Sequence, residues 1–188
     1  SNDGSIVAIS SRHNAGNGAL SGHVRVFKNV NDNWVQIGND INGKESGDRL
    51  FSISLSSDGN TLAIGAAAHD RNGEERGHVR LFQNVNDKWV QIGNDIYGEA
   101  AWDRSGHAVS LSSDGSIVAI GAPFNNGDSV TLQDVDGNDS TVLYIRRGHV
   151  RVYEYDANKD SIVLDQTSPD FGPVGWRRLG GDIDGEAA

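Results

Sequence analysis

The chain has 188 residues, 24 of them glycine, with no cysteine and no methionine, and its formal net charge at pH 7 is −10. An acidic surface repels nucleic acids and anionic membranes, and no apolar run approaches the roughly 18 residues that a membrane-spanning helix needs. The composition therefore argues against a nucleic-acid partner, a membrane span in this segment and a cysteine nucleophile.

Two motifs occur three times along the chain: Gly-His-Val-Arg, and an Asp-Gly pair followed by an apolar run. They begin at Gly22, Gly77 and Gly148 and at Asp3, Asp58 and Asp114, respectively. The first two copies are 55 residues apart, and the third is lengthened by insertions near 124–146 and 154–175. A fixed period of this kind indicates a repeat architecture, with repeats at 1–56, 57–112 and 113–188.

Each full repeat is predicted to form four short strands. The first, at 51–55 and 107–111, ends in Ser-Ser-Asp-Gly, a turn signal because aspartate caps its own backbone and glycine accepts positive φ. The second is a continuous apolar run, at 6–9, 62–64 and 117–120, as expected in the middle of a sheet. The third alternates from the His of Gly-His-Val-Arg onward, and the fourth begins with a tryptophan, at 34–37, 89–92 and 176–179. No segment shows helical periodicity, so the fold is predicted to be all-β.

Four antiparallel strands in about 55 residues, with Gly and Asp at the corners, are typical of one blade of a β-propeller. Residues 1–56 would supply strands two to four of one blade and the first strand of the next, so the chain is three tandem blades in permuted phase. A propeller ring needs about four to eight blades, and this chain is therefore not expected to close a ring alone. We expect strand addition from a neighbouring copy or a continuing chain to complete its edges, in a ring or a filament.

The third repeat carries a more specific pattern. Ser105 to Leu111 is followed by Ser-Ser-Asp-Gly, then by Gly121-Ala122-Pro123, then by the segment from Gly148 to Tyr153. This pattern resembles the FG-GAP repeat of integrin-α-like propellers. The resemblance implies an extracellular or cell-surface protein that serves in structure or adhesion.

The chain departs from that family at the calcium loop. Many FG-GAP blades carry an Asp-x-Asp-x-Asp-Gly loop between the first two strands, and here the connection is only Ser-Ser-Asp-Gly. A single aspartate cannot supply the about six to eight oxygen ligands that calcium takes, so no metal or other cofactor is expected there. A weaker calcium alternative lies in the first insertion, where solvated turns are the preferred interpretation. Its residues are Asp134, Asp136, Asn138 and Asp139.

Three sets of residues recur in phase and are interpreted as structural. They are His23, His78 and His149; Arg25, Arg80 and Arg151; and Trp34, Trp89 and Trp176. The histidines are too far apart in sequence for most zinc motifs, so each is expected to pack beside an arginine that pairs with a carboxylate of the neighbouring blade. The tryptophans are expected at equivalent, largely buried positions.

Motifs of catalysis are absent from the sequence, including Gly-x-Ser-x-Gly and His-Glu-x-x-His, so the chain is not expected to be an enzyme. One glycosylation sequon occurs, at Asn138 in the first insertion. Two functions stay open. The first is an extracellular structural or adhesive module that associates with itself, with neighbouring blades or with another extracellular protein. The second is a carbohydrate-binding propeller, which would need exposed aromatic residues in phase to hold a glycan.

Overall fold

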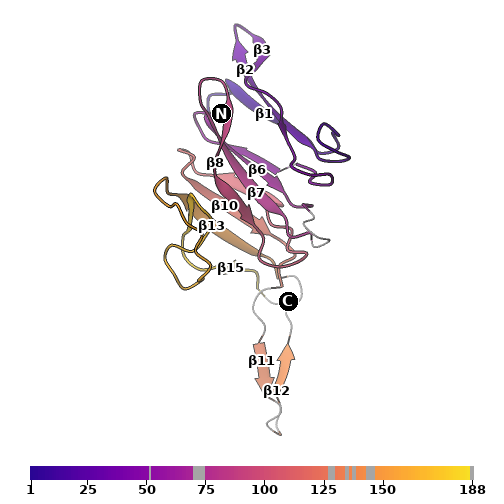
Figure 1. Cartoon of the computed structure of the whole chain (residues 1–188), viewed down its shortest axis with the longest axis vertical. Helices are drawn as coiled ribbons and strands as arrows, with labels where there is room; N and C mark the ends of the chain where they lie inside the picture. The colour runs from indigo at the N-terminus through magenta and orange to yellow at the C-terminus, as the bar shows by residue number, and fades with distance from the viewer. Residues whose placement is uncertain are drawn as a thin grey trace.

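The computed structural model describes residues 1–50, 52–69, 75–126, 130–133, 136, 139–142 and 147–186. Within these ranges all regular structure is β, as the sequence predicted, and most of it forms three antiparallel sheets. No helix in this part of the chain has the length and apolar character to cross a membrane. Figure 1 shows the three sheets following one another along the long axis of the molecule.

Each sheet repeats the same hairpin order. Sheet 1 contains β1 (Ile6–Ser11), β2 (His23–Val30), β3 (Asn33–Gln36) and β4 (Ile41–Asn42). Sheet 2 contains β5 (Ser52–Leu55), β6 (Thr61–Ala66), β7 (His78–Asn84) and β8 (Trp89–Tyr97). Sheet 3 contains β9 (Ala108–Leu111), β10 (Ile117–Ala122), β13 (His149–Tyr155), β14 (Trp176–Arg178) and β15 (Ile183–Asp184). In sheets 1 and 3, two short strands take the place of the single long β8.

The repeat phase of the sequence is also the register of the sheets. His23 of β2 lies opposite Asn42, His78 of β7 opposite Tyr97, and His149 of β13 opposite Asp184. Each tryptophan lies opposite the residue six positions after the histidine of its own sheet, which is Asn29, Asn84 or Tyr155. The three tryptophans therefore occupy equivalent positions.

The insertion that begins near 124 contains a separate hairpin of β11 (Val130–Gln133) and β12 (Asp139–Val142). Figure 1 shows it extending from the end of the molecule that holds sheet 3. Its base is closed by the backbone N–H of Gly148, which donates to the carbonyl of Asn125 at 3.0 Å. The same closure joins Gly22 to Asn14 in sheet 1 and Gly77 to His69 in sheet 2. The insertion thus lengthens a loop that the other repeats already contain.

Sheet 2 lies between the other two sheets and contributes to both apolar cores. Leu62 and Ile64 of β6 pack against sheet 1, whereas Ala63 between them packs against sheet 3. This alternation follows from the two-residue period of a strand. It explains why all six residues of β6 are buried. Sheets 2 and 3 also meet at their first strands, where Ser52 and Ser54 accept hydrogen bonds from backbone N–H groups of β9.

Candidate interaction faces and polar clusters

The side chains of each sheet lie on two faces, which we call front and back. The front face carries the His and Arg of Gly-His-Val-Arg, the aromatic residue two positions later and the tryptophan of the fourth strand. The front face of sheet 2 packs on sheet 1, and that of sheet 3 packs on sheet 2. Leu62, Ile64 and Phe82 of sheet 2, and Val118, Ile120, Tyr153 and Trp176 of sheet 3, are accordingly buried.

The front face of sheet 1 has the same apolar side chains but no sheet against it among the described residues. Val7 is 37% exposed, Ile9 53% and Trp34 51%, and Phe27 is half-buried. Their counterparts in sheet 3 are at most 3% exposed. The difference arises from what lies opposite the face, since the residue types and the register are equivalent.

The back face of sheet 3 shows the complementary situation. Val150 is 37% exposed and Ile183 is 61% exposed. The equivalent residues are buried in sheet 1, at Val24 and Ile41, and in sheet 2, at Val79 and Ile96. Among the described residues, the sheets thus form two front-to-back contacts, and the front face of sheet 1 and the back face of sheet 3 are uncovered.

A tryptophan packed on a glycine recurs at both internal contacts. A Cβ atom added to Gly38 would lie 2.8 Å from Cδ1 of Trp89, and one added to Gly93 would lie 2.8 Å from Cδ1 of Trp176. The indole N–H of Trp89 also donates to the carbonyl of Ile37 at 3.2 Å. The equivalent glycine of sheet 3, Gly180, has no atom within 4 Å of the same position. The space beside Gly180 that a tryptophan could occupy is therefore empty.

The prediction that all three tryptophans are largely buried is wrong for Trp34. Trp176 is fully buried and Trp89 is half-buried, whereas half of Trp34 is exposed. The indole becomes buried only when it packs on the glycine of the preceding sheet, and the described residues place no sheet in front of Trp34. Equivalent register is thus not enough to make equivalent burial.

Two of the three recurring arginines, Arg25 and Arg151, are held by carboxylates, and the two arrangements differ. Arg25 forms a two-bond ion pair with Asp40 of its own sheet, at 2.8 Å for both bonds, rather than with a neighbouring sheet. Hydrogen bonds from Arg25, and then from Gln36, lower the pKa of Asp40 to about 2. Arg151 binds Asp182 of its own sheet in the same way and also pairs with Glu99 of sheet 2.

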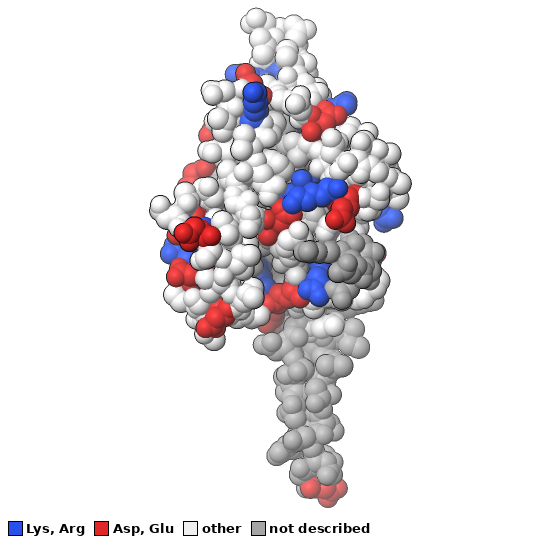
Figure 2. Space-filling view, viewed as in Figure 1, with Lys and Arg blue, Asp and Glu red and all other residues white. Residues whose placement is uncertain are grey.

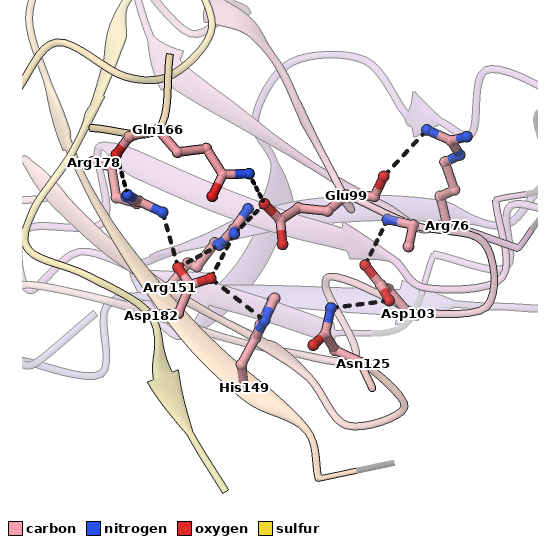
Figure 3. A network of polar contacts seen from close by, with 10 residues as sticks. Arg76, Glu99, Asp103, Asn125, His149, Arg151, Gln166, Arg178 and Asp182 are labelled. Atoms are coloured by element: carbon pink, nitrogen blue, oxygen red, sulfur yellow. Dashed lines mark hydrogen bonds and ion pairs between the residues drawn. The ribbon is translucent and has the colours of Figure 1, made fainter. Parts of the chain in front are cut away.

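Figure 3 shows the network around Arg151, which joins sheets 2 and 3. Asp182 accepts bonds from Arg151 and Arg178, and it lies 4.0 Å from Nδ1 of His149. Glu99 accepts a bond from Gln166 of the second insertion. Figure 2 shows the same mixing of charge on the surface, where basic and acidic side chains lie side by side on the visible face.

The residue directly after the glycine that follows the fourth strand has opposite charge in sheets 1 and 2, where it is Lys44 and Glu99, respectively. Lys44 of sheet 1 pairs with Asp95 of sheet 2 at 2.6 Å, and Glu99 of sheet 2 pairs with Arg151 of sheet 3. Arg80 instead donates to the carbonyl of Asn42 in sheet 1 at 2.8 Å. Glu186, the residue of sheet 3 that is equivalent to Lys44 and Glu99, is exposed. Both internal contacts therefore include an ion pair between adjacent sheets.

A second polar cluster lies at one end of sheet 2, and the sequence analysis did not foresee it. Asp48, from the loop before β5, lies beside His69, which follows β6, and His78, which begins β7. The exposed fraction of these residues is 0%, 2% and 0%. His69 shares a hydrogen bond of 2.6 Å with Asp48, and its ring meets that of His78 edge to face. His69 was missed because it has no histidine counterpart in the other repeats.

The remaining predicted sites lie on the first insertion. Asp134 and Asn138, and with them the predicted glycosylation site, fall outside the described residues. Asp136 is exposed, and Asp139 begins β12. The weak calcium alternative therefore has no described set of ligands.

One cavity of about 450 Å³ lies between the end of β8 and the second insertion. Its walls include Tyr97, Tyr153 and Phe171, and polar groups of Gln91 and Glu99. A cavity of about 660 Å³ lies at the equivalent place between sheets 1 and 2, where Asp40, Ile41, Arg80 and Phe82 form part of its walls. Of these two, only the cavity between sheets 2 and 3 has a wall from an insertion, which includes Phe171.

No protein-family model matches the chain, and no curated protein matches it.

Proposed function

We propose that this chain is a non-catalytic structural module of an extracellular or cell-surface protein, related to FG-GAP propellers, whose sheets act as blades. Its function is association through sheet faces: the front face of sheet 1 accepts the back face of sheet 3 of a second copy. The proposal rests on two exposed faces, the front face of sheet 1 and the back face of sheet 3. The molecule already buries two contacts between a front face and a back face.

The predicted contact has the two recurring elements of the internal ones. Trp34 would pack on Gly180, as Trp89 packs on Gly38 and Trp176 on Gly93. Glu186 would approach Arg25, as Glu99 pairs with Arg151. Burying Val7, Ile9 and Trp34 would remove apolar surface from water, at roughly 25 cal/mol per Å². Such a contact is heterologous, so it closes into a ring or grows into a filament. Two copies would supply six blades, within the range of about four to eight that rings use.

A carbohydrate-binding function has less support. It requires exposed aromatic residues in phase, and of the three equivalent tryptophans only Trp34 is mostly exposed. The aromatic lining of the cavities between sheets also differs, since Tyr97 and Phe171 line only the one between sheets 2 and 3. We therefore propose association rather than glycan binding.

Complementary blocking mutations test the contact. Ile9→Lys places a charge on the front face of sheet 1, and Ile183→Lys places one on the back face of sheet 3. Sedimentation velocity should show wild-type assemblies of two or more copies, monomers for each variant alone, and a heterodimer when the two variants are mixed, because one intact face of each kind then remains.

Leu164→Lys is the matched control, since Leu164 is 82% exposed and lies in the second insertion, away from both faces. This variant should associate as the wild type does. A wild-type chain that stays monomeric at all concentrations, or a mixture of the two variants that forms no heterodimer, would contradict the proposal.

A further inference from the structure

The cluster of Asp48, His69 and His78 has the composition and geometry of a metal site. One ligand atom from each residue lies within 4.8 Å of the other two. The set offers two imidazole nitrogens and one carboxylate oxygen, which suits Zn²⁺ and similar divalent transition metals, whereas calcium and magnesium prefer oxygen ligands alone.

The carboxylate of Asp48 is already oriented toward the histidines. Its Oδ2 accepts the backbone N–H groups of Lys44 at 2.6 Å and Glu45 at 3.1 Å. Oδ1 is thereby directed at Nδ1 of His69, 2.6 Å away. Ligand atoms around a tetrahedral zinc ion with bonds of about 2.0–2.2 Å lie roughly 3.4 Å apart, so this pair has to open slightly to admit the ion.

His78 supplies the independent observation. Neither of its ring nitrogens has a hydrogen-bond partner among the described residues, although the side chain is fully buried. Buried polar atoms are rarely left without a partner, because they have given up their bonds to water. A metal ion bound by one of the ring nitrogens would satisfy it.

Sheet 3 serves as an internal comparison. Its equivalent residues are Asp103, Asn125 and His149. Asn125 donates from its amide nitrogen to Oδ1 of Asp103 at 3.1 Å, and a backbone N–H, that of Ala100, again bonds to Oδ2. An asparagine therefore meets the structural need at this position. The histidine at position 69 adds a nitrogen lone pair, which an amide nitrogen does not offer to a metal.

The second cluster of potential ligands, Glu99, His149 and Asp182, is less suited to a metal ion. Arg151 bonds to both of its carboxylates, so their charge is already balanced. In the cluster of sheet 2, Asp48 forms no ion pair with an arginine or lysine side chain of the described residues.

We propose that Asp48, His69 and His78 bind a divalent transition metal, with Zn²⁺ the best fit, and that the ion fastens the loop before β5 to strands β6 and β7. The role is structural, because the ion would join the loop that carries Asp48 to the paired strands β6 and β7, where the hydrogen bond between Asp48 and His69 already makes one connection. Loss of the ion should loosen the connection between sheets 1 and 2.

The experiment uses the chelator-treated 188-residue chain and Co²⁺ as a spectroscopic substitute for Zn²⁺. The wild type should take up one Co²⁺ with the visible absorption of a low-coordinate nitrogen and oxygen site, and Zn²⁺ should displace it and raise the melting temperature. His69→Asn copies sheet 3, so it should fold, as checked by circular dichroism, and should lose both effects.

Two further variants complete the test. His78→Gln should also lose the Co²⁺ absorption, whereas His13→Asn, which alters an exposed histidine outside the cluster, should retain it. The proposal is overturned if the wild type takes up no more Co²⁺ than His69→Asn, or if the two chains show the same stabilisation by Zn²⁺.

Discussion

At the scale of single residues, the tryptophans show that burial depends on the neighbouring sheet. Trp34 and Trp176 have the same register within their sheets, yet one is 51% exposed and the other 0%. The difference arises because an indole is buried only where it packs on a glycine of the preceding sheet. A side chain at Gly38 or Gly93 would occupy the space of the indole that packs there. Both glycines also have positive φ, of 72° and 63°, which other residues adopt only with strain.

Replacing Trp176 by Ala is expected to lower the free energy of unfolding by roughly 3–5 kcal/mol, because it leaves a cavity between sheets 2 and 3. Trp34→Ala should cost clearly less in a dilute, monomeric sample, since half of that side chain is already in water. Urea unfolding monitored by circular dichroism measures both, with Trp102→Ala, at a loop residue that is 56% exposed, as the control. Equal losses for Trp34 and Trp176 would contradict the assigned packing.

At the scale of elements, the Asp-Gly turn is the most regular device of the chain. The Oδ1 atoms of Asp3, Asp58 and Asp114 each accept a serine hydroxyl at 2.5–2.6 Å, and each accepts the backbone N–H two residues later at 3.0 Å. The following glycine has a φ of 72–75° in all three turns. The turn is local, so it forms in the same way whether or not a first strand precedes it.

These turns should make stability depend on acidity. Hydrogen bonds from Ser112, then from the backbone and side chain of Ser116, lower the pKa of Asp114 from 3.8 to about 2. Because the folded pKa is the lower one, the unfolded chain binds more protons in this range, and the stabilisation is present above the unfolded pKa and is lost as the pH falls toward 2. Asp114→Asn should therefore weaken the fall in urea midpoint between pH 3.8 and about 2. If the urea midpoint of Asp114→Asn fell with pH as steeply as that of the wild type, the turn would not contribute to the pH dependence of stability.

At the scale of the whole molecule, the repeat tolerates insertions where its loops are already closed by backbone bonds. The bond from Gly148 to Asn125 has counterparts in both other sheets, and strands β11 and β12 pair only with each other among the described strands. The hairpin is thus an addition to sheet 3 rather than a part of it.

Residues 126–147 should therefore be replaceable by 15–21, the equivalent loop of sheet 1. The shortened chain is expected to keep its circular dichroism spectrum and to lose little of its melting temperature, because Asn125 and Gly148 still meet. As a control, the same replacement in a chain with Asn125→Ala should be less stable, since the bond to Asp103 is lost. Failure of the shortened chain to fold would mean that the insertion supports sheet 3.

Periodicity alone was enough to predict the all-β fold, the Asp-Gly turns and the equivalent positions of the tryptophans. These features depend on strand alternation, turn chemistry and pairing between neighbours in sequence, which are written in short stretches of the chain. The tertiary structure decided the rest. Whether Trp34 is buried depends on which sheet faces it, and the meeting of Asp48, His69 and His78 depends on how a loop folds back over two strands. Neither contact leaves a periodic signal, because each is made across the space between segments rather than along one of them.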